Sequence, residues 1–470
     1  MTSVRANWRK LWCVICASNQ QIKTFHSGED KSMSMSGKTL VTFFYKIILS
    51  FVSFVNGALT ARYLLSKGDR FDFQFTGTIS GTGTTYIGGY NGYWAYALSK
   101  RPQDLEDITQ MGNLFIFSLS FIVWVGALSV KLILGPQFNS VWLWAFLVMP
   151  FTFMFSYGSY LLQGSNQMSW LNRANLAQPL LFLIIYLPIF FDHRIPEHLR
   201  LTLSYVGWTA SFAIAGAGAI LVAYQLFGKH KVRRWRYSKR EWSGMFHYGG
   251  WLSISNLVNI ANYRMDLWLV KIYIPAAIAS DYGIAVVASE VLLNISQSIT
   301  QVVFTRMTGG SRGDAIAITE LSARQTLVST SIVAIGMYIF FPWLIVAAYG
   351  HRYAGALLPF FILLPGLVVK AASNVVLQYY TNQLGSPKTT IVMNGLSAAI
   401  NAVLCVIFLP TLGLVGGAIA STGSYVLSFI VYVYWFGKVN HISGLGLVRI
   451  RREDIMAYVD FAKRILRRGK

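Results

Sequence analysis

Residues 114–134 read LFIFSLSFIVWVGALSVKLIL, an apolar run that contains one charge, Lys131. A helix needs about 20 consecutive apolar residues to cross the hydrocarbon core of a bilayer. A second run, PLLFLIIYLPIFF, occupies residues 179–191. Backbone N–H and C=O groups in lipid must be satisfied within the segment itself, which favours helices. These runs therefore predict an all-α integral membrane protein.

The whole chain has the composition expected of a protein dissolved in lipid. Of its 470 residues, 54% are hydrophobic and only 12% are charged, whereas a soluble domain carries about 25% charged residues. The length leaves room for about 12 transmembrane helices joined by short loops. We predict spans at 39–61, 73–97, 113–134, 141–162, 171–191, 201–226, 246–273, 281–304, 325–348, 354–380, 389–409 and 413–436.

The basic residues predict the orientation of these spans. Lys and Arg number 40 against 18 Asp and Glu, and most of the bases fall in the termini and in the even-numbered loops. The positive-inside rule then places both termini in the cytoplasm. The densest cluster, KHKVRRWRYSKR at 229–240, is better explained by anionic lipid headgroups than by nucleic acid, so no nucleic-acid partner is expected.

The basic cluster also divides the chain into two halves of six spans. Both halves begin with a long helix that carries Asn near its middle and Arg near its outer end, as expected of two bundles around a midplane site. The residue pattern at the end of the basic tail (438–470) predicts an amphipathic helix that lies on the inner leaflet. The expected parts are a poorly ordered polar leader (1–37), a six-helix bundle (38–228), a basic cytoplasmic linker (229–245), a second six-helix bundle (246–437) and a basic tail (438–470).

The loops argue against an enzyme. The outward loops are short, and the longest, near 192–200, contains Glu197 as the one candidate for a catalytic acid of a membrane glycosyltransferase or polymerase. The glycine-rich stretch GTISGTGTT (77–85) lacks the Lys of a phosphate-binding loop. Cys13 and Cys16 form a C-x-x-C pair without the second pair that a zinc site needs. No enzyme activity, cofactor or metal is expected.

Charges within the spans are the main candidates for function, because each is costly if it faces lipid. The stretch NIANYRMDLWLVKIY (259–273) carries Arg264, Asp266 and Lys271. Residues two apart do not share a helix face, so Arg264 and Asp266 cannot neutralise each other locally. Arg264 therefore needs a partner on another helix, or a ligand. Two explanations stay open: ion pairs that only join helices, Arg264–Glu290 or Lys370–Asp266, and a positively biased cavity for an anionic head group.

The second span has an unusual composition for a helix in lipid. FTGTISGTGTTYIGGYNGYWAY (75–96) contains two Ile and no Leu or Val. Its small residues allow close approach of neighbouring helices, so the helix should be surrounded by protein or line a cavity. Tyr86, Tyr90 and Tyr93 share one helical face and are candidates for stacking on sugar rings; ordinary packing is the alternative.

An ordered series of segments resembles the bacterial polysaccharide flippases (Wzx-type) of the multidrug/oligosaccharidyl-lipid/polysaccharide exporter superfamily. The series is FVNGALTARYLL (54–65), LLQGSNQMSWLNRANLAQPLLFLIIYL (161–187), the stretch from NYRMD (262–266) through ASEVLL (288–293) to FTRMTG (304–309), and the stretch that begins NQLGSPKTTIVMNGL at residue 382. The similarity covers roughly residues 36–440. The charged segment LSKGDRFDFQF after Arg62 departs from the family pattern.

The resemblance implies two six-helix bundles around a central cavity lined by the first, second, seventh and eighth spans. It implies that undecaprenyl-diphosphate-linked oligosaccharide is moved across the bacterial cytoplasmic (inner) membrane by alternating access, without covalent chemistry. A polysaccharide polymerase is a further expected partner. The expected diphosphate-binding residues are Arg62, Arg264 and Lys370. The expected sugar contacts are Tyr86, Tyr90 and Tyr93, and the expected ion-coupling residues are Asp266 and Glu290.

Other functions stay open at this point. A drug or cation exporter of the same superfamily would be favoured by a cavity richer in acid than in base, and the deep charges here lean the other way. A glycan-synthesis scaffold would use the basic 229–240 loop and the tail as contact surfaces.

Overall fold

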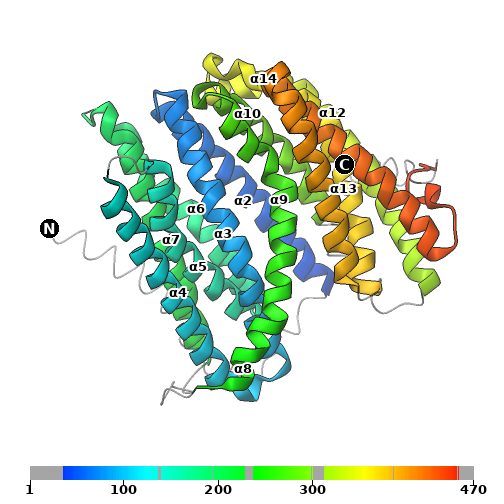
Figure 1. The fold of residues 1–470 in the computed structure, drawn as a ribbon, viewed down its shortest axis with the longest axis horizontal. Coiled ribbons are helices and arrows are strands. Elements are labelled where there is room, and N and C mark those ends of the chain that lie inside the picture. The colour runs from blue at the N-terminus through cyan, green and yellow to red at the C-terminus, as the bar shows by residue number, and fades with distance from the viewer. Residues whose placement is uncertain are drawn as a thin grey trace, which may run out of the picture. The chain divides into compact units, whose positions relative to one another are not determined.

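The computed structural model places the run at 114–134 inside one long helix, α4 (Leu105–Leu134). The structure describes residues 35–135, 139–192, 194–227, 237–297, 299, 312–384, 386–451 and 454. Throughout these residues the regular elements are helical and none is a strand (Figure 1). The predicted all-α class is therefore confirmed.

The helices follow the predicted spans closely. The N-terminal half contains α2 (Met35–Tyr63), α3 (Lys67–Lys100), α4, α5 (Ser140–Gly164), α6 (Met168–Phe191) and α7 (Glu197–Phe227). After a short α8 (Lys239–Gly244) and a π-turn, η5 (Met245–Gly249), come α9 (Gly250–Tyr273), α10 (Ala276–Ser289), the 3₁₀ turn η6 (Glu290–Leu292), α12 (Arg312–Tyr349), α13 (Leu357–Gln378) and α14 (Pro387–Asn440). The predicted eighth span is described as far as residue 299.

Helix α14 contains the last two predicted spans. Its helical geometry is interrupted at Gly413, where φ is 57°, a conformation that glycine adopts without the steric cost of a Cβ. The break coincides with the predicted boundary between 409 and 413. Within the described residues, eight helical segments are long and apolar enough to cross a membrane, and one of them, Lys388–Asn440, holds both of these spans. The chain is a multi-pass membrane protein.

The helices before and after the basic linker pack mainly with their own neighbours. Helix α5 packs against α3, α4 and α7, whereas α13 packs against α10, α12 and α14. The two sets meet where α3 contacts α9 and α10, and Figure 1 shows α3 and α9 running alongside each other. The predicted division into two six-helix bundles at residues 228 and 246 stays a prediction, because these contacts join the sets into one compact unit from Tyr45 onward.

Helix α3 is enclosed by protein, as its composition predicts. It packs against α5, α9 and α10, and Phe71 and Trp94 are fully buried. Its glycines allow the approach to α9: a Cβ at Gly89 would overlap the backbone nitrogen of Ser253. At Gly81, by contrast, an added Cβ would meet open space.

The chain after α14 folds back onto α12. Arg324 donates from Nε to Asp454 Oδ2 at 2.8 Å and from Nη1 to the Gly446 carbonyl at 2.9 Å. Burial alone would raise the pKa of Asp454, but the backbone N–H of Arg451 and the Arg324 guanidinium outweigh it and hold this pKa below its ordinary value. The start of the predicted basic tail is therefore docked.

Three predicted features fall mostly or wholly on residues outside the described ranges. These are the polar leader before Met35, the linker segment 228–236 and the amphipathic helix predicted after residue 454. Their predicted order and membrane contacts stay predictions. Where the leader was expected to extend to residue 37, helix α2 already begins at Met35.

Candidate functional site

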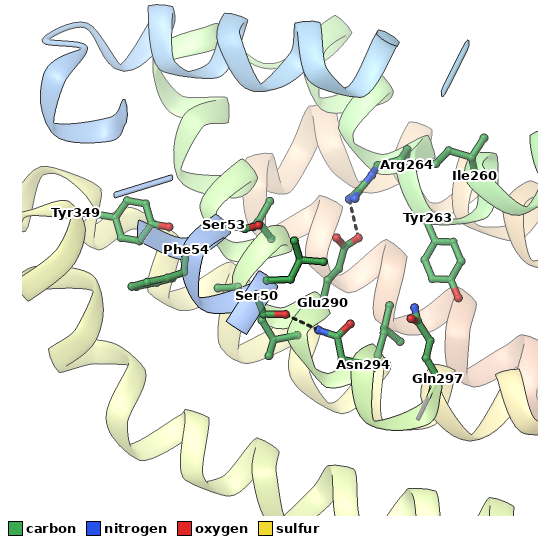
Figure 2. A pocket seen from close by; sticks show the side chains of 15 residues that line it. Ser50, Ser53, Phe54, Ile260, Tyr263, Arg264, Glu290, Asn294, Gln297 and Tyr349 are labelled. Carbon is green, nitrogen blue, oxygen red and sulfur yellow. Dashed lines mark hydrogen bonds and ion pairs between the residues drawn. The ribbon is translucent and has the colours of Figure 1, made fainter. Parts of the chain in front are cut away.

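A cavity of about 400 Å³ lies among α2, α9, α10 with η6, and the end of α12 (Figure 2). The first, seventh and eighth predicted spans contribute to its wall, and the predicted second span contributes no residue. Its volume is typical of small-molecule sites. The polar lining consists of Ser50, Ser53, Tyr263, Arg264, Glu290, Asn294, Gln297 and Tyr349.

The two charges in this wall form an ion pair. Arg264 Nη1 donates to Glu290 Oε1 at 2.6 Å, and Figure 2 shows the two side chains pointing at each other from α9 and η6. The pair is in contact with the cavity, since the Arg264 and Glu290 side chains are 26% and 19% exposed. The first alternative raised from the sequence, an Arg264–Glu290 pair, is therefore present.

Asp266 points to a different environment from that of Arg264, as their spacing of two residues predicts. It is 3% exposed and accepts hydrogen bonds from Tyr282 Oη at 2.7 Å and Ser421 Oγ at 3.1 Å. These donors come from α10 and α14. No ion pair between Asp266 and Lys370 occurs among the described residues.

Lys370 is a buried amine without a hydrogen-bond acceptor in the described part of the chain. Its side chain on α13 is 1% exposed, and Nζ has no hydrogen-bond partner. Nζ lies 4.9 Å from the ring centroid of Tyr263 and 5.5 Å from that of Tyr425. Because Tyr263 lines the cavity, Lys370 stands one side chain behind the cavity wall.

A third basic side chain lies at the edge of the same cavity. Lys46 Nζ on α2 donates to Gln297 Oε1 at 3.5 Å, and Gln297 is part of the lining. Lys46 lies within the first predicted span (39–61), but the sequence does not indicate its neighbour, because that neighbour depends on how α2 packs against the eighth span.

The structure places Arg62 away from this cavity. Its Nε donates to the Ala348 carbonyl at 2.8 Å, and Nη2 donates to the Ala347 carbonyl. In return Arg352, just after α12, donates to the Ala61, Leu64 and Leu65 carbonyls.

Carbonyl groups at a helix C-terminus lack intrahelical donors and attract cations. Arg62 on α2 and Arg352 beyond α12 therefore cap each other's helix. We call these contacts the reciprocal arginine caps. The predicted role of Arg62 in binding diphosphate stays untested.

The predicted sugar contacts also lie outside the cavity lining. Tyr86 and Tyr90 pack edge to face with ring centroids 5.8 Å apart. Tyr93 Oη donates to Glu241 Oε2 at 2.9 Å. The three tyrosines thus face each other and the segment that leads into α9, and their predicted role with sugars stays a prediction.

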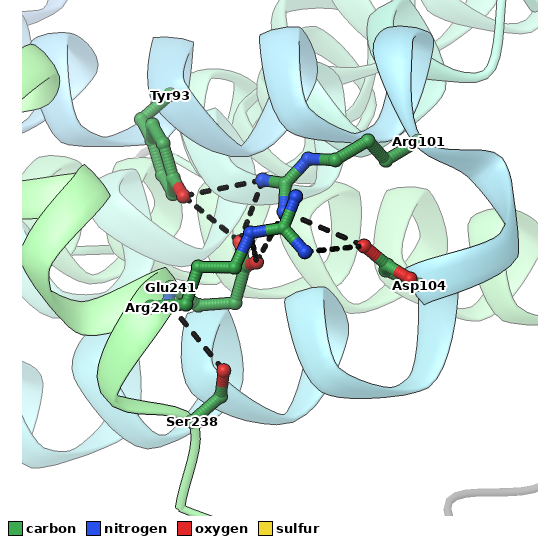
Figure 3. Close-up of polar contacts among 6 residues, drawn as sticks. All are labelled: Tyr93, Arg101, Asp104, Ser238, Arg240 and Glu241. Carbon is green, nitrogen blue, oxygen red and sulfur yellow. Dashed lines mark hydrogen bonds and ion pairs between the residues drawn. The ribbon is translucent and has the colours of Figure 1, made fainter.

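Glu241 is the centre of a charged cluster that the sequence did not predict (Figure 3). Arg101 donates to both of its carboxylate oxygens, at 2.6 and 3.1 Å, and also to Asp104 at 3.4 Å. These hydrogen bonds, which Arg101 donates to the Glu241 carboxylate, raise the pKa of Arg101 above its ordinary value. The cluster fixes α8 against the corner between α3 and α4. The sequence did not predict it because Glu241 and its partners lie far apart in the chain and no spacing pattern connects them.

The described residues contain no group of three His, Cys, Asp or Glu side chains placed to hold a metal ion. Glu197, the candidate catalytic acid, is exposed at the start of α7 and does not line the cavity.

Comparisons with known proteins place the fold. No family model matches the sequence, and a search of curated proteins finds no match. Among solved structures, the chain is similar to a lipid II flippase, MurJ, in an inward closed conformation, with a TM-score of 0.68 and 14% identity over 90% of this chain and 93% of that one.

Two further structures show the same fold. A multidrug resistance MATE family transporter of the MOP superfamily, in its inward-facing conformation, has a TM-score of 0.64 and 12% identity, covering 84% of this chain and 96% of that chain. A MOP superfamily transporter from Pyrococcus furiosus, described as having a binding pocket of reverse polarity that suggests a different function, has a TM-score of 0.51 and 13% identity, covering 85% and 96%. At these identities the similarity is one of fold.

Proposed function

We propose that the chain is a flippase that moves polyprenyl-diphosphate-linked oligosaccharide across the bacterial cytoplasmic membrane by alternating access. The observation that carries the proposal is the charge around the cavity. Arg264 lines it, while Lys46 and Lys370 each contact a lining residue. Among the described residues that line this cavity, Glu290 is the one acid.

The second deep acid does not offset this bias at the cavity. Asp266 is directed to the hydroxyl groups of Tyr282 and Ser421. A buried site with more bases than acids favours an anionic ligand, and a guanidinium matches the oxygens of a phosphate by paired hydrogen bonds. The cavity volume suits a head group, so the polyprenyl tail would remain in lipid.

The fold supports transport as the activity, because MurJ and the MATE transporters share it. Transport requires that the substrate or a coupling ion bind the two facing states with different affinity. We propose coupling to a proton or sodium gradient through Asp266 or Glu290. Covalent chemistry is not part of this function, and a polysaccharide polymerase would act on the product.

A drug or cation exporter is the second candidate. The observation in its favour is the carboxylate of Glu290 in the cavity wall, in a fold shared with a multidrug resistance transporter. A cationic substrate would need Glu290 without its present partner, and it would meet the repulsion of Lys46 and Lys370.

Complementation tests the first candidate. A bacterium that lacks its own polysaccharide flippase receives the native chain, Arg264→Ala, Asp266→Ala or, as a matched control, Arg194→Ala at an exposed position outside the cavity. At equal membrane levels, we expect the native chain and Arg194→Ala to restore surface polysaccharide and Arg264→Ala to leave lipid-linked precursor accumulated.

Two results would count against this function. Restoration by Arg264→Ala would reduce the arginine to a structural partner of Glu290. Failure of the native chain, together with resistance to cationic dyes in the same strain, would favour the exporter.

A further inference from the structure

The Arg264–Glu290 pair differs from the other arginine–carboxylate pairs of buried acids. Glu241 receives two hydrogen bonds from Arg101 and has a side chain that is 2% exposed. Asp454 has a side chain that is 3% exposed, and its arginine bonds a backbone carbonyl as well. Both acids are held in fully packed surroundings.

Arg264 uses its donors less completely. Among the hydrogen bonds of the described residues, its Nη1 group alone has an acceptor, although a guanidinium carries five N–H donors. The Arg264 and Glu290 side chains are 26% and 19% exposed, and both line the cavity. An anion entering the cavity therefore meets an arginine whose fork is only partly occupied.

The backbone at Glu290 is irregular at the same place. Helix α10 ends at Ser289, and Glu290 begins the 3₁₀ turn η6 (Glu290–Leu292) before helical structure resumes. A short 3₁₀ stretch inside a helix often marks a hinge. The acid that pairs with Arg264 thus lies at the point of the eighth span where the helix is least regular.

We propose that Glu290 is a tethered competitor for the anion site. Its carboxylate occupies Arg264 when only weakly binding anions are present, and a diphosphate displaces it. This inference rests on the proposed function and adds the rule by which the site selects its ligand. Because the carboxylate is attached to the chain, it returns to Arg264 whenever the site is empty, at a high effective concentration.

The selection follows from two free-energy terms. Displacing Glu290 costs the same for every anion that takes its place. The gain depends on the anion: a ligand with more negative charge gains more from the positive field of Lys46 and Lys370, and a second phosphate offers more oxygens to the free donors of Arg264. Glu290 therefore lowers both affinities by the same factor, so that at a given concentration a diphosphate still occupies the site while a single phosphate, which gains less, does not.

Binding of inorganic pyrophosphate and inorganic phosphate to the purified full-length protein tests the proposal by titration calorimetry. We expect Glu290→Gln to bind both anions more tightly than the native chain by a similar factor of about tenfold, within the range of typical coupling between sites. Arg264→Gln should bind neither. The control Glu197→Gln removes an exposed acid outside the cavity and should match the native chain.

The alternative role, in which Glu290 positions Arg264 for its ligand, predicts the opposite sign. Weaker binding by Glu290→Gln, or binding equal to that of the native chain, would overturn the proposal. If Glu290→Gln does not give a monodisperse protein, Glu290→Asp serves instead: its shorter arm should weaken the competition and tighten both anions, and unchanged affinities would reject the inference.

This test is separate from the test of the proposed function. If Glu290→Gln binds anions more tightly but the native chain does not complement, the flippase proposal is rejected and the tethered competitor is supported. If the native chain complements but Glu290→Gln binds anions with unchanged affinity, the tethered competitor is rejected and the flippase proposal is supported.

Discussion

Replacing the buried amine of Lys370 should stabilise the protein. The side chain is 1% exposed and its Nζ has no hydrogen-bond partner in the described structure. A buried polar group without a partner costs about 1–3 kcal/mol, and more when it is charged. The rings of Tyr263 and Tyr425, at 4.9 and 5.5 Å, return about 2 kcal/mol each when desolvated, which is less than the several kcal/mol that burial of an ammonium group costs.

The balance favours removal of the amine. Methionine occupies a similar shape, is flexible and packs well against aromatic rings. We therefore expect Lys370→Met to raise the free energy of unfolding by about 1 kcal/mol, which corresponds to a rise of about 1–2 °C in the thermal midpoint of a chain of this size. If the amine contributes to anion binding, the same variant should complement less well, so stability and activity would change in opposite directions.

Thermal unfolding of the detergent-solubilised protein measures the effect. The control is Lys131→Met in the last turn of α4, where Nζ donates to the Gly135 carbonyl at 2.9 Å and the substitution should lower the midpoint slightly. A lower midpoint for Lys370→Met than for the native chain would refute the reasoning, because it would mean that the amine has a stabilising interaction.

Three further predictions concern the packing of the helices. Arg62→Ala and Arg352→Ala should each lower the free energy of unfolding, and by only about 0.5–1 kcal/mol because both side chains are largely exposed. In the double variant the two effects should be less than additive. Thermal unfolding measures both. The folded pKa of Asp454 lies below its ordinary value, so its contribution to stability is complete above about pH 4 and is lost as pH falls through the folded pKa; below pH 4 the native midpoint should drop more steeply than that of Asp454→Asn. Gly89→Val should abolish folded protein in the membrane fraction because its side chain would overlap the α9 backbone, whereas Gly81→Val should accumulate normally.

Sequence alone predicts most of this fold because lipid restricts the choices so strongly. Each apolar run must be a helix, and the predicted spans 73–97 and 246–273, which contain more polar or small residues, lie in α3 and in η5 with α9. The break at Gly413 lies at the boundary predicted between the spans 389–409 and 413–436. The divergence of Arg264 and Asp266 followed from helix periodicity.

The contacts that the sequence did not predict are made with groups that no sequence pattern identifies. Arg62 bonds to the carbonyls of Ala347 and Ala348, and every residue carries a carbonyl. The sequence predicted that the helix α3 is surrounded by protein or lines a cavity, but it did not predict that the neighbour of its tyrosines is the segment around Glu241. The position of that segment depends on how the chain folds back after α7. The second span consequently contributes no residue to the cavity lining.

The three charges of the stretch 259–273 have different partners, so that one helix is joined to several neighbouring elements. Asp266 accepts from α10 and α14, Arg264 bonds to η6, and Lys271 pairs with Asp72 of α3 at 2.5 Å. Helix α9 thus connects the cavity to the contact between the two sets of helices.

Arg264 and Lys271 are seven residues apart, on one face and about 10 Å apart along the axis. A ligand that changes the Arg264–Glu290 pair therefore acts on the same rigid element that holds Lys271 against α3. The proposed alternating access would use such a link, because binding moves the equilibrium between two facing states only if the states differ in their interaction with the ligand. In the proposed cycle α9 would carry this link, because it holds charges that are costly in lipid in contact with both η6 and α3.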